Sequence, residues 1–380
     1  MRYLRTIVFP LLSVIILALA LQGCGGGGGK SGVNPPGSDP QNYLTYLYVG
    51  NTHSNDLKVY SALTDGTINL LMTHTWGEPK YSVYATEATP DGKHLALVYY
   101  DSSQSAYILE IYSINQQTGD LDFPCGSASL GTSQPFTLLF TPDSKFLYLL
   151  DDKSNILGFS LGSNGTLTSL GKLVTLDSFA VRNPALTPDG SYLYVPGWKG
   201  YPNNSYKLHI YKVESGGYLT LTNTYDTGRA PDSVVFSGQY VYLGQLDGID
   251  CFKVINPGEI TKLATFTEGQ TLAPILQCVD KSGKYMLGTS YTDKKIEVFQ
   301  INPVDGTLTS KNTFDTDISP MDFAFHPNNR LLYITCSSNG SSANLYTYSF
   351  NLTTGDISNG QGYSVGDTPW DISLAKIATP

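Results

Sequence analysis

The chain has 380 residues, and its 23 Lys and Arg against 32 Asp and Glu give a formal net charge of −9. This acidic balance argues against a nucleic-acid partner, because nucleic-acid binding needs a basic surface. Only 14% of the residues are charged, whereas Gly and Tyr account for 38 and 27 residues. Such a mixture suits strands and tight turns better than surface helices, so the composition predicts an all-β protein.

The N-terminus has the pattern of an export signal. Arg2 and Arg5 precede an apolar run from Ile7 to Leu21. That run is short for a membrane span, which needs about 20 apolar residues, and it fits the apolar region of a signal peptide. We therefore expect residues 1–23 to be a signal peptide.

The sequence after this run is Leu21-Gln22-Gly23-Cys24, which resembles the bacterial lipobox. The resemblance implies that Cys24 is acylated with palmitate-type chains and becomes the new N-terminus, so that the membrane is a partner. The alternative is an ordinary cleaved signal without a role for Cys24. Residues 24–42 are rich in Gly, Pro and Ser and predict a flexible tether. We expect an exported, membrane-anchored lipoprotein that faces the periplasm or the cell surface, with its folded domain at residues 43–380.

The four cysteines after Cys24 do not have metal-binding spacing. They are Cys125, Cys251, Cys278 and Cys336, and no two are closer than 27 positions. We interpret them as structural residues, buried or disulfide-bonded, with three pairings open. The sequence predicts no metal site and no cofactor.

A first repeat recurs about every 48 residues. Each unit has a glycine turn, an Ile or Leu two residues later, and an aromatic ring six or seven residues earlier. Apolar residues alternate around the ring, as in a strand with one buried face. The rings therefore predict packing between repeats. The glycines are Gly66, Gly119, Gly165, Gly217, Gly258, Gly306 and Gly355, and the rings are Tyr60, Tyr112, Phe159, Tyr211, Phe252, Phe299 and Tyr348.

A second repeat is a turn between two apolar strands. Its clearest copies are Thr89–Gly92, Thr141–Ser144 and Thr187–Gly190, and looser copies are Phe236–Gly238, Lys281–Gly283 and His326–Asn329. Pro followed by Asp and Gly favours a β-turn, because Pro fixes φ and Gly accepts positive φ. The second repeat has six copies, one fewer than the first.

The two chain ends explain the missing copy. Pro369–Leu374 resembles the strand before the second turn, and Tyr46–Val49 resembles the strand after it. Together they complete a seventh unit, in which the C-terminal strand is innermost. Four strands in each of seven repeats predict a seven-bladed β-propeller closed by pairing of the terminal strands. We expect a monomer.

These motifs resemble those of the lactonase-type seven-bladed propellers, a family that includes bacterial 6-phosphogluconolactonase. The likeness covers about residues 43–377 and includes the hairpin Asp305–Thr309 and the segment Ser364–Trp370. It implies the propeller fold strongly and the reaction weakly, because the shared residues are turns and packing positions.

The resemblance also implies where catalytic residues would lie. Family enzymes carry a His before one Pro-Asp turn, an Arg-His pair opening the next innermost strand, and an Asn-Glu pair after the following strand. The corresponding residues here are Arg182, Asp232-Ser233 and Gln245-Leu246. None of them is suited to activating water near pH 7.

The best place for a ligand is the mouth of the central channel, where the innermost strands begin. Asp322 and Asp371 each lie two residues after a Pro, so we expect them in matching positions of successive blades. Carboxylates there could bind a cation or sugar hydroxyls, and arginines an anion. The alternative is that they cap strand ends or face bulk water. The tentative site comprises Arg182, Asn183, Arg229, Asp232, Gln245, Asp322 and Asp371.

Two functions remain open from the sequence, beside a weaker third, an assembly scaffold for an envelope complex. The first is a membrane-tethered propeller that binds a small sugar, a lactone or an envelope protein without the usual family acid and base. The second is an exported hydrolase of an unphosphorylated lactone, whose water is activated by a group not identified in the sequence, such as a metal held by Asp322 and Asp371.

Overall fold

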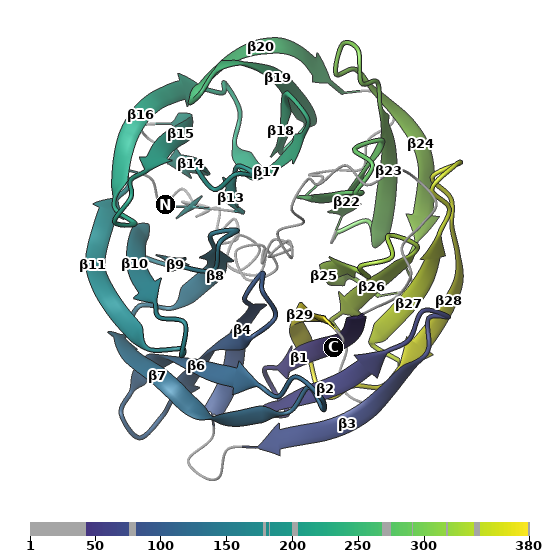
Figure 1. Ribbon diagram of the computed structural model, residues 1–380. Helices are drawn as coiled ribbons and strands as arrows, with labels where there is room; N and C mark the ends of the chain where they lie inside the picture. Colours follow the sequence, from purple (N-terminus) through teal and green to yellow (C-terminus); the bar gives the residue numbers. More distant parts are fainter. Residues whose placement is uncertain are drawn as a thin grey trace, which may run out of the picture.

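The structure of the protein, a computed structural model, describes residues 43–75, 81–177, 180–181, 183–199, 204–267, 275–290, 292–316, 318–337 and 343–378. These residues form seven antiparallel sheets arranged as blades around one axis (Figure 1). None of the described elements is a helix that could span a membrane. The protein is a seven-bladed β-propeller, as the two repeats predict.

Each blade has four strands in order from the axis outward. Blade 1 contains β29 (Pro369–Ala378), β1 (Tyr43–Asn51), β2 (Asp56–Ala62) and β3 (Ile68–Thr75). Blade 2 contains β4 (Tyr81–Ala88), β5 (His94–Asp101), β6 (Ala106–Ile114) and β7 (Leu121–Gly131). Blade 3 contains β8 (Pro135–Phe140), β9 (Phe146–Asp151), β10 (Asn155–Leu161) and β11 (Leu167–Thr175).

In blade 4 the innermost strand is split into β12 (Ala180–Val181) and β13 (Ala185–Leu186), followed by β14 (Tyr192–Lys199), β15 (Ser205–Val213) and β16 (Leu219–Asp226). Blade 5 contains β17 (Pro231–Ser237), β18 (Tyr240–Gln245), β19 (Gly248–Asn256) and β20 (Glu259–Phe266). Blade 6 contains β21 (Ile275–Val279), β22 (Tyr285–Ser290), β23 (Lys295–Ile301) and β24 (Leu308–Asp315). Blade 7 contains β25 (Pro320–Phe325), β26 (Leu331–Cys336), β27 (Leu345–Phe350) and β28 (Ile357–Tyr363).

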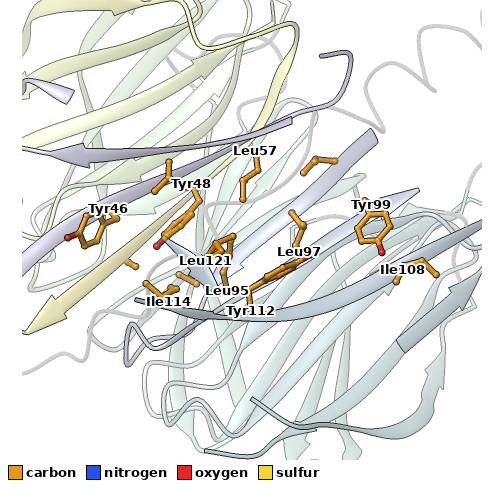
Figure 2. Close-up of a cluster of buried hydrophobic side chains, with 14 of the residues drawn as sticks. Tyr46, Tyr48, Leu57, Leu95, Leu97, Tyr99, Ile108, Tyr112, Ile114 and Leu121 are labelled. Atoms are coloured by element: carbon orange, nitrogen blue, oxygen red, sulfur yellow. The ribbon is translucent and has the colours of Figure 1, made fainter. Parts of the chain in front are cut away.

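The core lies between neighbouring blades. The second strands are almost wholly buried, whereas the outermost strands, such as β3, alternate between partly buried and exposed residues. This is the pattern expected when inner strands are covered on both faces. Figure 2 shows the packing of Tyr48 and Tyr46 of blade 1 against Leu95 and Leu121 of blade 2. All seven aromatic rings of the first repeat are buried, which confirms their predicted role in the core.

The hairpin glycines fit against the preceding blade. Gly306 has φ of 74°, and a Cβ there would lie 2.6 Å from Cδ1 of Tyr240 in blade 5. The hydroxyl of Tyr242 donates a hydrogen bond of 2.9 Å to the Gly306 carbonyl. The same contact joins Tyr48 to Gly119 at 2.7 Å and Tyr148 to Gly217 at 2.9 Å. Each of these glycines is therefore needed for both its backbone conformation and its lack of a side chain.

Replacing Gly306 by alanine is expected to lower the free energy of unfolding by about 2 kcal/mol, because strain at positive φ adds to the collision with Tyr240. Gly228 is a matched control, since it also has φ of 74° but a Cβ there would meet nothing within 4 Å. Gly228→Ala should cost only about 1 kcal/mol. Urea unfolding of both variants measures the difference, and equal losses would show that contact with the preceding blade is unimportant.

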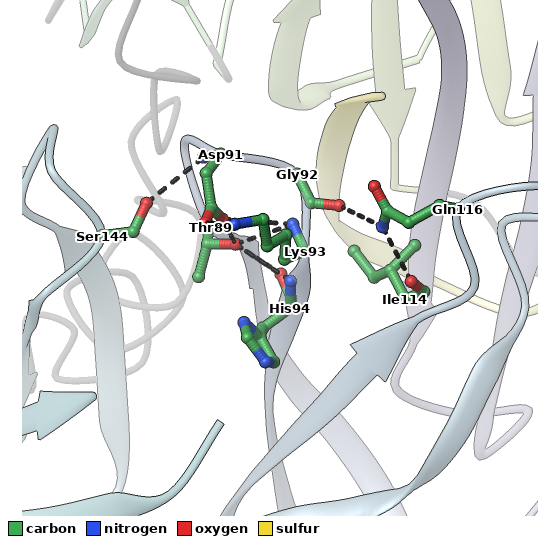
Figure 3. A network of polar contacts seen from close by, with 8 residues as sticks. All are labelled: Thr89, Asp91, Gly92, Lys93, His94, Ile114, Gln116 and Ser144. Atoms are coloured by element: carbon green, nitrogen blue, oxygen red, sulfur yellow. Dashed lines mark hydrogen bonds and ion pairs between the residues drawn. The ribbon is translucent and has the colours of Figure 1, made fainter. Parts of the chain in front are cut away.

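The Pro-Asp turns join the first and second strands of blades 2, 3 and 4. In blade 2 the hydroxyl of Thr89 donates to Asp91 at 2.7 Å and accepts the His94 N–H at 3.0 Å (Figure 3). The Asp91 N–H donates to the Ser144 hydroxyl of blade 3 at 3.2 Å. The turn sequence thus fixes both the hairpin and its contact with the next blade.

The ring is closed by the two ends of the described chain, as predicted. β29 pairs with β1 antiparallel, from Tyr43 opposite Ala378 to Asn51 opposite Pro369. This closure leaves no innermost strand without a partner in its sheet, so exposed sheet edges at the axis are avoided.

The four cysteines of the described chain are free thiols, so the disulfide alternative is not realised in the structure. Cys251 and Cys336 are buried, and burial raises the pKa of their thiols to about 11 and about 12. Such thiols remain protonated and unreactive at neutral pH.

Candidate functional site

The seven innermost strands begin at the same end of the ring, which we call the rim. In blade 1, Pro369 opens β29 opposite Asn51, the last residue of β1. The connections between second and third strands lie at the rim for the same reason. The loops around Ser103 and after Trp198 are both of this kind, although residues 200–203 lie outside the described chain.

In the described chain, the innermost strands of six blades, all except blade 4, have a β-bulge near the rim. In β4, Val83 pairs with Tyr99 and Ala85 with Val98, so Tyr84 has no partner in β5. A bulge of this kind interrupts the alternation of the strand and turns one side chain to a new direction. The bulged residues are Trp370 in β29, Tyr84 in β4, Phe136 in β8, Asp232 in β17, Gln277 in β21 and Met321 in β25.

Asp322 and Asp371 directly follow the bulge in β25 and β29, in the matching positions that the sequence predicts. Asp322 accepts hydrogen bonds from the N–H groups of Phe323 at 2.8 Å and Ile372 at 3.0 Å. Oδ2 of Asp371 accepts two hydrogen bonds from Thr86, one from its backbone N–H and one of 3.0 Å from its hydroxyl. Each carboxyl therefore joins its own blade to the next one.

The same kind of bond continues around the axis with hydroxyl groups. The Ser373 hydroxyl accepts the Ala88 N–H at 2.7 Å, and the Ser233 hydroxyl accepts the Leu276 N–H at 2.8 Å. The free edge of an innermost strand has N–H groups without a partner in its own sheet, and these side chains satisfy them.

Glu87 is the third carboxyl near the axis, in the blade that follows Asp371. Its side chain is only 6% exposed. Among the described residues no hydrogen bond to its carboxyl is found, whereas Asp371 is close enough to interact with it electrostatically. Unlike Asp322 and Asp371, Glu87 therefore forms no hydrogen bond between two blades among the described residues.

Burial raises the pKa of Glu87 well above its usual value, and the nearby charge of Asp371 raises it further. Burial also raises the pKa of Asp371, and the hydrogen bonds from Asp322 and Thr86 oppose that rise in part. A hydrogen bond between the carboxyls of Asp322 and Asp371 requires a proton on one of them. Two carboxyls at the axis, Glu87 and Asp371, therefore have pKa values that burial raises above their ordinary values.

The structure places the other predicted site residues at the rim of blades 4 and 5. Asn183 is 3% exposed, and neither polar atom of its side chain has a hydrogen bond to another described residue. Gln245 is 1% exposed and donates to Asp250 at 2.5 Å, whereas its Oε1 has no partner within the described part of the chain. Asp232 is partly exposed, and Arg229 is exposed and pairs with Asp247 at 2.8 Å. Arg182 and Cys24 lie outside the described residues.

Two groups of residues escaped the sequence analysis. Glu87 lies two residues before Thr89 of its turn, and the residues at this position in blades 3, 5 and 7 are Leu139, Val235 and Ala324. The residue at this position in blade 1 is Ser373, so Glu87 is the carboxylate among mostly apolar or small residues, a signal that aligning the innermost strands could have found. The bulged aromatic residues give no such signal, because a bulge depends on pairing with the second strand.

The described residues contain no group of three or more His, Cys, Asp and Glu side chains arranged to hold a metal ion. Asp322 and Asp371 direct their oxygens to backbone N–H groups instead. The donor set at the axis therefore does not fit the metal-assisted version of the lactonase hypothesis.

A ring of seven four-stranded blades with polar and aromatic residues at the rim of its axis defines a seven-bladed propeller with an axial candidate site. The family model described as "Lactonase, 7-bladed beta-propeller" matches residues 42–268 and 245–374. The chain belongs to this lactonase family. No curated protein matches it in sequence.

Solved structures show the same fold. The chain is similar to the periplasmic gluconolactonase PpgL of Pseudomonas aeruginosa, with a TM-score of 0.71 and 19% identity over 89% of this chain and 100% of that one. A candidate 6-phosphogluconolactonase of Bacteroides fragilis has a TM-score of 0.71 and 17% identity over 90% and 99% of the two chains. One of Bacteroides uniformis has a TM-score of 0.71 and 18% identity over 88% and 100%. At these identities the likeness shows the fold.

Proposed function

We propose that this protein is an exported lactone hydrolase whose site lies at the rim of the propeller and whose water is activated by Glu87. The observation that carries the proposal is a buried carboxyl near the axis with a raised pKa and no hydrogen bond among the described residues. A general base works best when its pKa is near the working pH, and burial is the usual means of raising a carboxyl to that range. Membership of the lactonase family supports the same reaction class.

The chemistry needs one base that later returns its proton. The Glu87 carboxylate takes a proton from water as the water oxygen attacks the lactone carbonyl carbon. The ring C–O bond then breaks, and Glu87 gives the proton to the departing alkoxide, which leaves a hydroxy acid. Asp371, held by Thr86, lies close enough for its negative charge to raise the pKa of Glu87 and so to increase its basicity.

The proposal is tested by hydrolysis of a panel of lactones by the purified protein, comprising glucono-1,5-lactone, its 6-phosphate and simple acyl lactones. We expect turnover of an unphosphorylated sugar lactone. A phosphorylated lactone would need an arginine to bind its phosphate. Arg229, the arginine at the described part of the rim, is already paired with Asp247. No turnover of any lactone above the spontaneous rate would overturn the proposal.

A second candidate, a binding propeller without catalysis, is favoured by two residues in the positions of the family acid and base. The Ser233 hydroxyl accepts the Leu276 N–H, and Gln245 donates to Asp250. Both side chains contribute to the fold. Ligand binding without turnover would be the result expected for this candidate.

Export and lipid anchoring complete the proposal. They are supported by the signal-like segment before Cys24 and by the periplasmic location in the name of the similar Pseudomonas protein. Replacing Cys24 by serine is expected to abolish incorporation of labelled palmitate and to move the protein from the membrane fraction to the soluble fraction. Cys125→Ser is the control and should retain the label. Unchanged labelling of Cys24→Ser would contradict anchoring at this residue.

A further inference from the structure

The bulged residues of the innermost strands differ in kind around the rim. Three of them are aromatic and partly exposed, namely Trp370, Tyr84 and Phe136. They belong to blades 1, 2 and 3, which are consecutive around the axis. We call these three residues the aromatic arc. Among the other bulged residues, Asp232 in blade 5 is partly exposed and Met321 in blade 7 is 3% exposed.

The exposure of the aromatic arc is not a general property of its strands. The residues on either side of Tyr84, Val83 and Ala85, are 1% and 2% exposed. Neighbouring blades cover both faces of each innermost strand, and the second strand covers its outer edge. Solvent therefore reaches a bulged side chain only from the axis or the rim, which is where a ligand would arrive.

Further aromatic rings support the arc in blade 2. Tyr84 lies edge-on to Tyr107, with ring centroids 5.1 Å apart, and Tyr107 lies edge-on to Tyr100 at 5.0 Å. These contacts fix the direction of the Tyr84 ring, and Tyr84 also hydrogen-bonds to Tyr107. A platform held in this way loses little conformational freedom on binding.

The charges near the rim favour an uncharged ligand. Asp232 is a bulged residue, and the cations Arg229 and Lys199 are paired with Asp247 and Asp177 at 2.8 Å each. Lys153, in the rim loop of blade 3, donates a hydrogen bond of 3.3 Å to the Thr132 hydroxyl. Flat aromatic faces suit the apolar face of a sugar ring, and carboxylates accept hydrogen bonds from its hydroxyls. Tyr84 also precedes Glu87 by three residues, or about 10 Å along a strand. That distance leaves room for one sugar ring and the Glu87 side chain.

We propose that the aromatic arc, Trp370, Tyr84 and Phe136, is the binding subsite for the ring of an uncharged sugar-derived lactone, with Asp232 accepting hydrogen bonds from its hydroxyls. The proposal rests on the lactonase function given above and identifies its substrate class. It assigns a positioning function to three aromatic residues of blades 1, 2 and 3, and it retains Asp232 of blade 5 from the residues that the family resemblance indicates.

The test uses the purified full chain and two probes. The first is the non-hydrolysable D-glucono-1,5-lactam, whose binding is measured by calorimetry. The second is glucono-1,5-lactone, whose hydrolysis gives KM and kcat. Trp370→Leu and Tyr84→Leu are expected to weaken lactam binding and to raise KM by about 5- to 20-fold, with kcat changed less than about threefold. Trp370→Phe should restore most of the affinity, because it keeps a flat ring.

Two controls separate the arc from general effects on folding. Met321→Leu changes a bulged but buried residue, and Phe123→Leu changes an aromatic residue on the outer strand β7 that is 92% exposed. Both should leave lactam binding unchanged. If Trp370→Leu does not fold, Tyr84→Leu and Trp370→Phe carry the test, with thermal unfolding as the check on each variant.

The outcomes distinguish this inference from the proposed function. Lactone hydrolysis with KM unaffected by Trp370→Leu and Tyr84→Leu would overturn the subsite and leave the hydrolase standing. Lactam binding that depends on the arc, without hydrolysis, would support the subsite and overturn the hydrolase. Absence of lactam binding by the unmodified chain, or preferential binding of gluconate or of the 6-phosphate, would overturn the subsite.

Discussion

Glu87→Gln is expected to lower kcat for lactone hydrolysis by about 10²- to 10⁴-fold while KM changes little, because the amide keeps the shape of the side chain but cannot accept a proton from water. The variant should remain folded. Burial disfavours the charged form of Glu87, so a neutral amide at this position removes no stabilising charge interaction. Steady-state kinetics on the lactone that the protein hydrolyses fastest measures the effect.

The pH dependence follows from the direction of the pKa shift. A general base acts in its deprotonated form, so kcat/KM should rise as the pH increases through the pKa of Glu87. That pKa is raised well above 4.5. As the pH is lowered, activity should therefore be lost at a higher pH than for an enzyme whose base is an ordinary carboxylate. A rate that stays constant from pH 5 to pH 8, after correction for spontaneous hydrolysis, would exclude Glu87 as the base.

Glu297→Gln is the matched control for this substitution. Glu297 is also a buried glutamate, 1% exposed, but it lies on the third strand of blade 6 and accepts a hydrogen bond from Ser310 at 3.1 Å. It should retain the activity and pH profile of the unmodified protein. Equal losses in the two variants would indicate a general effect of removing a buried carboxylate.

Asp322→Asn and Asp371→Asn are expected to change stability in opposite directions. The two oxygens of Asp322 accept from two different N–H groups, so an amide would place its NH₂ against one of them and cost about 1–3 kcal/mol. The Thr86 bonds of Asp371 both go to Oδ2, which the carbonyl oxygen of Asn can replace. The new NH₂ can then donate to Asp322. We expect a gain in the free energy of unfolding at pH 7 of about 1.4 kcal/mol for each pH unit by which the pKa of Asp371 is raised.

The direction of the pH effect distinguishes these causes. The folded-state pKa of Asp371 is raised above 3.8, so its protonated form stabilises the fold below that value. This contribution is lost as the pH rises through the raised pKa. Asp371→Asn mimics the protonated form, and its advantage should therefore grow from pH 4 to pH 8. Urea unfolding across this range is the measurement, and an advantage that shrinks with rising pH would show that Asp371 is stabilising as a carboxylate.

Much of the fold could be predicted from the sequence, because its turns depend on local chemistry. Gly306 needs positive φ, and Thr89 and Asp91 form a turn from their own side chains, so both repeats are visible without knowledge of the partners. Closure by β29 could also be predicted, since Pro369–Leu374 has the pattern of an innermost strand with no other partner available. Such features are set within a few residues of the chain.

The candidate site could be predicted only in part. The matching positions of Asp322 and Asp371 follow from the Pro two residues before each. Their carboxyl oxygens also accept hydrogen bonds from N–H groups of the next blade. These bonds depend on how two blades pack against each other, and a local sequence pattern does not contain that information. The same holds for Glu87, whose pKa is set by tertiary burial, and for Trp370, whose exposure results from a bulge.

The closure of the ring also determines how an anchored molecule would face its surroundings. Tyr43 begins β1 opposite Ala378, at the end of the ring away from the rim. In the proposed lipoprotein, the 19 residues from Cys24 to Tyr43 would span at most about 65 Å and would join the propeller at its base. A flexible tether attached at the base would allow the rim to face away from the bilayer. Solutes could reach the aromatic arc from the aqueous side without passing between the protein and the lipid headgroups.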